Sequence, residues 1–216
     1  MRVDVITLHA VQNYGSVLQA LATQKLLEKH GCEVKIINYI REDVRYKNIL
    51  QARSNGNIIK KIVLYPNVKK WEKVFKGFCN EYLNLTDRSY TTENDFKDYP
   101  LDADMFCTGS DQVWNSKWNQ GIISPLYLSF VPEDKFRFSL AASFGQDKLS
   151  QDEVKATKKY IEKYNCISVR ESSGKKIIEQ QYKYSYAEHI IDPTLMLDDD
   201  EWRKFANNKK TTEDYI

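Results

Sequence analysis

The first 39 residues place two apolar segments on either side of one helix-forming segment, and this order constrains the fold more than any other feature. Met1–Leu8 and Val34–Tyr39 are predicted to be strands, because both are short and dominated by apolar residues. The segment between them opens as a helix at Val17–Ala22, for which Ser16 is the expected N-cap and Gly31 the expected stop. A strand, a helix and a strand in this order predict a parallel βαβ unit.

The same alternation continues along the chain. Ala103–Asp111 and Phe136–Gly145 each begin as an apolar strand and end in small residues that include a glycine, and Cys166–Val169 is a further short strand. Helices are expected after Ser150 and after either Ser172 or Ser173, which are suitable N-caps. Strands that alternate with helices at this spacing predict an α/β fold with a Rossmann-like, doubly wound parallel sheet.

Charge, cysteine and histidine content narrow the classes of function. A net charge of +2 argues against nucleic acid as the main partner, because proteins that bind nucleic acid usually carry a clustered basic excess. The four cysteines are far apart in the sequence, which is typical of reduced thiols in a cytoplasmic protein. The three histidines are scattered and indicate no metal site, and no run of about 18 apolar residues is present to span a membrane. We therefore expect a cytoplasmic protein without a metal.

Residues 58–83 combine six lysines with the aromatic residues Trp71, Phe75 and Phe78. We expect helices here, broken near Pro66. In the preferred interpretation the lysines form a solvated face and the aromatic residues pack on the domain. The alternative is that this basic amphipathic segment makes a peripheral contact with a membrane, at its inner face.

Polar and small residues gather where the predicted strands end. In open α/β sheets, ligands bind outside the carboxyl ends of the strands, and the N–H groups of a helix N-terminus favour an anion. The predicted binding residues at these ends are Asn13, Tyr14, Gly15, Ser16, Gly109, Ser110, Ser143, Gly145 and Arg170. Gly15 is expected to require a positive φ or a close approach of the ligand. Asp111 is expected to cap its turn, or alternatively to orient a hydroxyl or act as an acid or base.

Four segments, in order along the chain, carry a likeness to a known family: His9–Gln24, Gly109–Asn115, Ser168–Ser173 and Asp192–Leu195. The chain resembles the polysaccharide pyruvyl transferase family, particularly members from bacterial capsule and exopolysaccharide loci. This resemblance implies two Rossmann-like domains in a glycosyltransferase-B-like arrangement, with the active site in the cleft between them. Other members of the family carry Gly-Gly-Gly where this chain has Gly109-Ser110-Asp111.

The resemblance also implies a reaction. Similar proteins transfer an enolpyruvyl-derived group from phosphoenolpyruvate to a sugar, which forms a pyruvate ketal and releases phosphate; phosphoenolpyruvate is the donor substrate and no cofactor is implied. Arg170 matches a phosphoenolpyruvate-binding arginine of the family, and a guanidinium fork suits a carboxylate or a phosphate. The structural alternative is a surface charge pair with Glu171. His9 and Asp111 are the candidates for the acid and base that ketal formation requires.

Two other functions are compatible with these residues. One is a sugar-nucleotide glycosyltransferase of the same architecture, which would bind a nucleotide sugar and no phosphoenolpyruvate. The other is a non-catalytic domain that binds a glycan or an anion, for which the complete protein would be inactive. The sequence leaves both open.

The domain organisation follows from the same patterns and from the resemblance. Residues 1–197 are predicted to form the N-terminal Rossmann-like domain, and residues 198–216 to begin a linker or second domain, with a strand starting near the last residues. We expect these residues to fold but not to catalyse alone, since half of the cleft would be missing. A lipid-linked sugar is one candidate acceptor. The face that should meet the second domain is expected to favour self-association.

Overall fold

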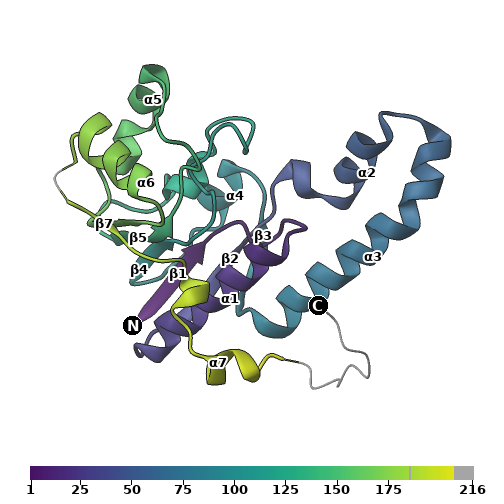
Figure 1. Cartoon of the computed structure of the whole chain (residues 1–216), viewed down its shortest axis with the longest axis horizontal. Coiled ribbons are helices and arrows are strands. Elements are labelled where there is room, and N and C mark those ends of the chain that lie inside the picture. The colour runs from purple at the N-terminus through teal and green to yellow at the C-terminus, as the bar shows by residue number, and fades with distance from the viewer. Residues whose placement is uncertain (185, 207–216) are drawn as a thin grey trace.

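The computed structural model describes residues 1–184 and 186–206, and its centre is a seven-stranded sheet in which every neighbouring pair of strands is parallel (Figure 1). The strands are β1 (Arg2–Ile6), β2 (Glu33–Tyr39), β3 (Leu85–Tyr90), β4 (Met105–Thr108), β5 (Phe136–Ala142), β6 (Cys166–Val169) and β7 (Ala187–His189). Their spatial order is β3-β2-β1-β4-β5-β6-β7. This order confirms the predicted Rossmann-like, doubly wound sheet.

Helices connect the strands and cover both faces of the sheet. The α-helices are α1 (Tyr14–Lys29), α2 (Tyr46–Ser54), α3 (Ile58–Tyr82), α4 (Glu93–Asp98), α5 (Gln151–Ile161), α6 (Ser172–Lys176) and α7 (Asp199–Arg203). Short 3-10 turns lie at Glu42–Val44, Ser124–Tyr127 and Pro193–Leu195, and a π-helical stretch at Ile177–Gln181 continues α6.

The apolar core is divided into two layers by the sheet. On one face, α1 and α3 pack against β1 and β2 around Leu21 and Ile36, and the cluster reaches Trp202 of α7. On the other face, α4, α5 and α6 enclose a second cluster around Phe106 and Trp114. Trp114 is 1% exposed, so this tryptophan belongs to the core.

The sheet has its topological switch point between β1 and β4. From β1 the chain moves outward to β2 and β3, and then returns to place β4 on the opposite side of β1. The connections on the two sides therefore lie on opposite faces of the sheet, and the carboxyl ends of β1 and β4 are neighbours at the point between them. Ligands of open α/β sheets bind at this place.

The start of α1 differs from the prediction by three residues. Asn13, and not Ser16, is the N-cap: its backbone is extended and its Oδ1 accepts a hydrogen bond from Ser16 N at 3.2 Å. Asparagine caps a helix as well as serine does, so the sequence offered two suitable positions. Capping by Asn13 leaves the Ser16 hydroxyl free for another partner. The predicted stop is confirmed, since Gly31 follows the end of α1 with φ +80°.

α3 is one continuous helix, so the prediction of a break near Pro66 was wrong. A proline inside a helix removes one backbone hydrogen bond. Packing against α2 on both sides of the proline holds the helix together: Val68 is buried, and the rings of Tyr46 and Tyr65 are 5.8 Å apart.

The strand expected near residues 211–216 lies outside the described residues. Within the described ranges, every helix is too short or too polar to cross a bilayer.

Candidate functional site

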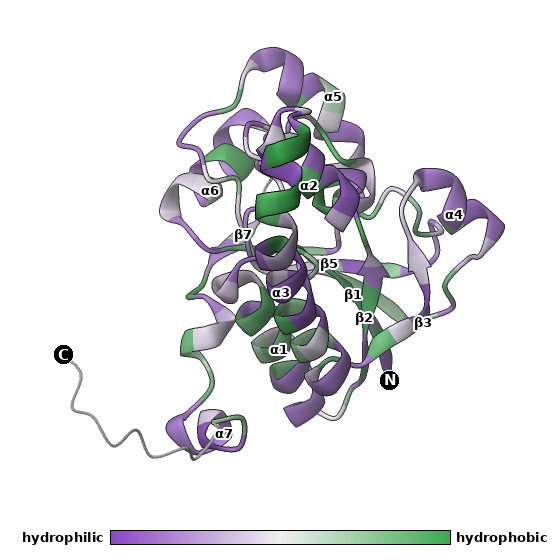
Figure 2. Ribbon diagram, turned by 90° about the vertical axis from the view of Figure 1, so that its right-hand side faces the viewer, coloured by the Kyte–Doolittle hydropathy of each residue, from purple (hydrophilic) through white to green (hydrophobic). Residues whose placement is uncertain are grey.

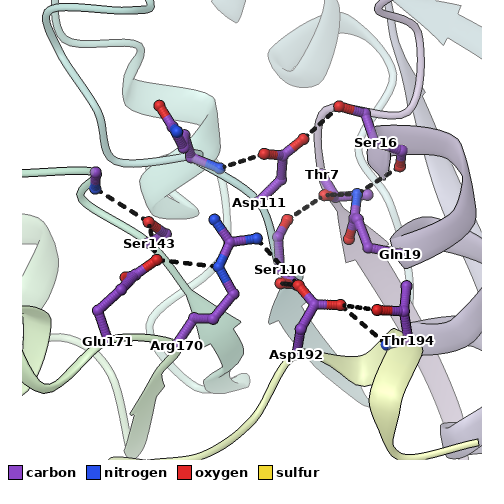
Figure 3. Close-up of polar contacts among 12 residues, drawn as sticks. Thr7, Ser16, Gln19, Ser110, Asp111, Ser143, Arg170, Glu171, Asp192 and Thr194 are labelled. Atoms are coloured by element: carbon purple, nitrogen blue, oxygen red, sulfur yellow. Dashed lines mark hydrogen bonds and ion pairs between the residues drawn. The ribbon is translucent and has the colours of Figure 1, made fainter. Parts of the chain in front are cut away.

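Polar side chains from the loops after five strands meet at the carboxyl edge of the sheet and form one hydrogen-bonded network (Figure 3). The network joins Thr7, Ser16, Gln19, Ser110, Asp111, Ser143, Arg170, Glu171, Asp192 and Thr194. The structure thus brings together the predicted binding residues Ser16, Ser110, Ser143 and Arg170 with the predicted candidate Asp111.

Asp192, which follows β7, accepts four hydrogen bonds. Its Oδ2 accepts from Ser110 Oγ at 2.8 Å and from Arg170 Nη1 at 3.0 Å. Its Oδ1 accepts from the backbone N of Thr194 at 2.9 Å and from the Thr194 hydroxyl at 2.7 Å. Burial alone would raise the pKa of Asp192, but these hydrogen bonds outweigh burial and hold the pKa below its usual value. The ionised carboxylate therefore ties the loops after β4, β6 and β7 together.

The guanidinium of Arg170 lies between two carboxylates. Its Nε donates to Glu171 Oε1 at 3.0 Å, and its Nη1 donates to Asp192 at 3.0 Å. Burial lowers the pKa of Arg170, but the hydrogen bonds to Asp192 and Glu171 outweigh it, so the pKa is raised. The expected pair with Glu171 exists, although the Arg170 side chain is only 25% exposed and is no ordinary surface charge. Among the described residues, none accepts a hydrogen bond from Nη2, which leaves that edge of the guanidinium free for a ligand.

Ser143 continues the network beyond Glu171. Its hydroxyl donates to Glu171 Oε1 at 2.8 Å and accepts a hydrogen bond from the backbone N of Gly145 at 3.0 Å. Gly145 has φ +56°, and a Cβ there would lie 2.4 Å from Asn115 Nδ2. Glycine is therefore required at this position both for its backbone conformation and for space.

Asp111 connects the loop after β4 to α1. Its Oδ2 accepts a short hydrogen bond of 2.5 Å from Ser16 Oγ, and its Oδ1 accepts from the backbone N of Gln112 at 2.7 Å. Its backbone has φ 85°, which is costly for a residue other than glycine. The backbone of Asp111 also forms a parallel bridge with Ala142, the last residue of β5. Asp111 therefore accepts a hydrogen bond within its own turn and also holds the Ser16 hydroxyl at the start of α1.

The N-terminus of α1 faces this network. Asn13 caps it, and Gly15 is the second residue of the helix and does not have a positive φ, which excludes the first of the two predicted reasons for a glycine here. A Cβ at Gly15 would lie 3.2 Å from Asn13 Oδ1, which is a close approach of the cap itself. Tyr14 is 59% exposed, and its ring packs 5.1 Å from that of Phe75.

Beneath the network, the ends of β1 and β4 are in close contact. A Cβ at Gly109 would lie 3.1 Å from Thr7 Cβ. The Thr7 hydroxyl donates to the carbonyl oxygen of Ser110 at 2.7 Å and accepts from Gln19 Nε2 at 2.9 Å. Gly109 thus permits the strands to approach and lies beneath the network.

Comparison with known proteins assigns the chain to a family. The family model described as polysaccharide pyruvyl transferase matches residues 13–216. The chain belongs to the polysaccharide pyruvyl transferase family. Neither a curated protein nor a solved structure matches the chain. The resemblance seen in the sequence is therefore confirmed, and family membership indicates a transferase of polysaccharide biosynthesis.

In this pyruvyl transferase family member, His9 lies apart from Asp111. It is 2% exposed, and its Nδ1 lies 3.4 Å from the carbonyl oxygen of Thr7. Burial lowers the pKa of His9, so the imidazole is neutral at pH 7. His9 lines a cavity of about 690 Å³ between β2 and the helices α2 and α3, together with Asn38 and Phe75. Sequence reasoning grouped His9 with Asp111, but His9 lines this cavity and Asp111 belongs to the hydrogen-bonded network.

Two carboxylates of the site were not predicted as functional residues. Glu171 was considered as a surface partner of Arg170, and Asp192 only as part of a segment that carries the family likeness. Both follow short strands directly, and this position was the available signal, because the carboxyl ends of parallel strands meet at one edge. Within the ranges that the structure describes, no three His, Cys, Asp or Glu side chains are placed to hold a metal ion.

Proposed function

We propose that the chain helps to transfer the enolpyruvyl-derived group of phosphoenolpyruvate to a sugar of a bacterial surface polysaccharide, as a pyruvate ketal. The observation that carries this proposal is the guanidinium of Arg170, held by Glu171 and Asp192 at the carboxyl edge of a sheet in a pyruvyl transferase family member. Two carboxylates fix the orientation of the fork, and the free Nη2 edge suits the carboxylate or phosphate of the donor.

The first N–H groups of α1 supply a second element for an anion. A helix of 16 residues has unpaired N–H groups and a partial positive charge at its N-terminus. Asn13 occupies only the N–H of Ser16, so the groups of Tyr14 and Gly15 are available to the donor. The network itself is anionic, because it holds three carboxylates, those of Asp111, Glu171 and Asp192, against the one guanidinium of Arg170. We therefore propose that further cations come from a second domain.

The chemistry requires a proton for the methylene carbon and a base for the attacking hydroxyl. Asp111 is the proposed base, since its carboxylate already accepts a hydrogen bond from a hydroxyl, that of Ser16. We propose that the sugar enters the neighbouring cavity, where His9 lies beside the amide of Asn38 and the ring of Phe75. Amide groups and an aromatic face are suited to sugar hydroxyls and to the apolar face of a sugar ring.

Protection against thermal unfolding tests the donor assignment. Phosphoenolpyruvate should raise the melting temperature of the chain, and a nucleotide sugar should not. Arg170→Lys keeps the charge but loses the planar fork, and should weaken donor binding by about one to two decades, since a charge-assisted hydrogen bond contributes roughly 1.5–3 kcal/mol. Arg203→Lys, at a side chain that is 75% exposed, is the matched control. Unchanged protection in Arg170→Lys would refute the role of Arg170, and protection by a nucleotide sugar alone would favour a glycosyltransferase.

A further inference from the structure

The helix hairpin formed by α2 and the first half of α3 extends away from the sheet (Figure 1). Four aliphatic side chains in the first two turns of α3 are exposed there: Ile58 at 74%, Ile59 at 74%, Ile62 at 68% and Val63 at 70%. Figure 2 shows green, hydrophobic bands in the hairpin of α2 and α3. Ile58 and Ile62 lie one helical turn apart, as do Ile59 and Val63, so the four side chains share one side of the helix. We call these four residues the aliphatic patch.

The second half of α3 uses its apolar residues differently. Phe75 and Cys79 are buried against the domain, and the ring of Trp71 stacks on that of Phe75 at 5.7 Å. The aromatic residues therefore pack on the domain, as the preferred interpretation of the sequence predicts. The same interpretation does not cover the aliphatic patch, which has no such packing in the described part of the chain.

Positive charge is concentrated around the aliphatic patch. Residues 45–76 contain nine basic side chains and one acidic side chain, Glu72, whereas the rest of the chain has a net charge of −6. The nine are Arg45, Lys47, Arg53, Lys60, Lys61, Lys69, Lys70, Lys73 and Lys76. Among the described residues, only Arg45 of these nine forms an ion pair, with Glu42 at 3.2 Å.

We propose that the aliphatic patch inserts into the interfacial region of an anionic phospholipid membrane, with the surrounding lysines bound to the lipid headgroups. Apolar side chains of an interfacial helix enter the acyl boundary, and basic side chains on its polar side extend to the headgroups. Tyr65, 44% exposed and next to Lys69, is a residue type that is enriched at this boundary.

Charge distinguishes this partner from a second copy of the chain. Two copies that met through the aliphatic patch would bring two strongly basic segments together, which is repulsive. An anionic membrane is complementary to the same segment, and each basic residue near its surface adds favourable binding. The proposal does not depend on the proposed reaction, because it concerns only where the protein is held.

Sedimentation with lipid vesicles tests the proposal. The chain should bind vesicles of phosphatidylcholine mixed with phosphatidylglycerol, and bind phosphatidylcholine alone much more weakly. Ile59→Ser and Val63→Ser should each weaken binding by about tenfold, since each removes a large part of an aliphatic side chain that the membrane would bury. Lys60→Gln should weaken binding by about fivefold, and added salt should reduce this difference. Ile122→Ser, at an exposed isoleucine elsewhere, and Lys155→Gln, on α5, are the matched controls.

A direct measurement complements the sedimentation. Tryptophan fluorescence of Ile62→Trp should shift to shorter wavelength with the mixed vesicles, because the indole leaves water. Equal binding of the patch variants and the controls, or no binding to the mixed vesicles, would overturn the proposal. Dimerisation that Ile59→Ser abolishes, without vesicle binding, would instead assign the aliphatic patch to a second copy.

Discussion

Replacing Asp192 with asparagine tests whether the carboxylate network holds the carboxyl edge of the sheet together. The Asp192 side chain is 17% exposed and accepts hydrogen bonds from Ser110, Arg170 and Thr194. An asparagine side chain would have nearly the same shape, but its amide N would replace one of the two accepting oxygens. That oxygen is either Oδ2, to which Ser110 and Arg170 donate, or Oδ1, to which the backbone N and hydroxyl of Thr194 donate. The substitution therefore removes charge and hydrogen bonds without creating a cavity.

The expected loss follows from these contacts. Removing one partner of a buried ion pair costs about 3–5 kcal/mol. Arg170 keeps Glu171 as a partner and is 25% exposed, so the loss should be smaller, about 2–3 kcal/mol at pH 7. The native pKa of Asp192 is below the unfolded value, so its contribution is present above about pH 4 and is lost as the pH falls through the native pKa. The difference between the two proteins should therefore shrink in acid.

Urea unfolding at pH 7 and at low pH measures both quantities, with the free energy of unfolding taken by linear extrapolation. Asp199→Asn is the control, because Asp199 is 93% exposed and contacts Arg203 only at 3.9 Å. That variant should unfold like the unmodified protein. A loss below about 0.5 kcal/mol in Asp192→Asn, or a loss that does not change with pH, would contradict our account of the network.

Two further substitutions test single positions of the structure by the same unfolding measurement. Gly145→Ala should cost about 3 kcal/mol, because its Cβ would meet Asn115 Nδ2 at 2.4 Å in addition to the strain of φ +56°. Gly31 also has a positive φ, +80°, but a Cβ there would meet no other atom, so Gly31→Ala should cost only about 1 kcal/mol. Equal costs for the two substitutions would refute the close contact between a Cβ at position 145 and Asn115. Burial raises the pKa of Asp4 to about 6, so the native state binds this proton more tightly and loses stability as the pH rises from about 4 to 6. Asp4→Asn should therefore raise the free energy of unfolding at pH 7, by at most about 3 kcal/mol, and the gain should vanish below about pH 4. A gain that is independent of pH would show that the charge of Asp4 is not its cause.

Most strands were predictable because strand formation depends on local patterns, but the polar strand β3 was not predicted. Val34–Tyr39 lies within β2, and Cys166–Val169 coincides with β6. Alternation of strands and helices then leads to a parallel doubly wound sheet, which the structure has. The start of α1 was less certain, because Asn13 and Ser16 are both good caps and only the contact of Ser16 with Asp111 separates them.

The partners within the site were not predictable from local patterns. Arg170 and Asp192 are 22 residues apart, and only the pairing of β6 with β7 brings their loops together. The side on which the His9 side chain lies could not be predicted either, because a loop has no regular periodicity that places its side chains on one face. Pro66 shows the reverse case: its local effect was known, but the packing of α2 against α3 outweighs it.

Analysis of the reaction products tests the proposed function most directly. The protein that contains these 216 residues would be incubated with phosphoenolpyruvate and candidate lipid-linked or nucleotide-linked sugars, and phosphate and modified sugar would be measured by colorimetry and mass spectrometry. Our account predicts one phosphate released for each sugar that gains a pyruvate ketal, with a lower rate in Arg170→Lys. Release of a nucleotide with transfer of a sugar, or a pyruvylated product formed at the full rate by Arg170→Lys, would contradict it.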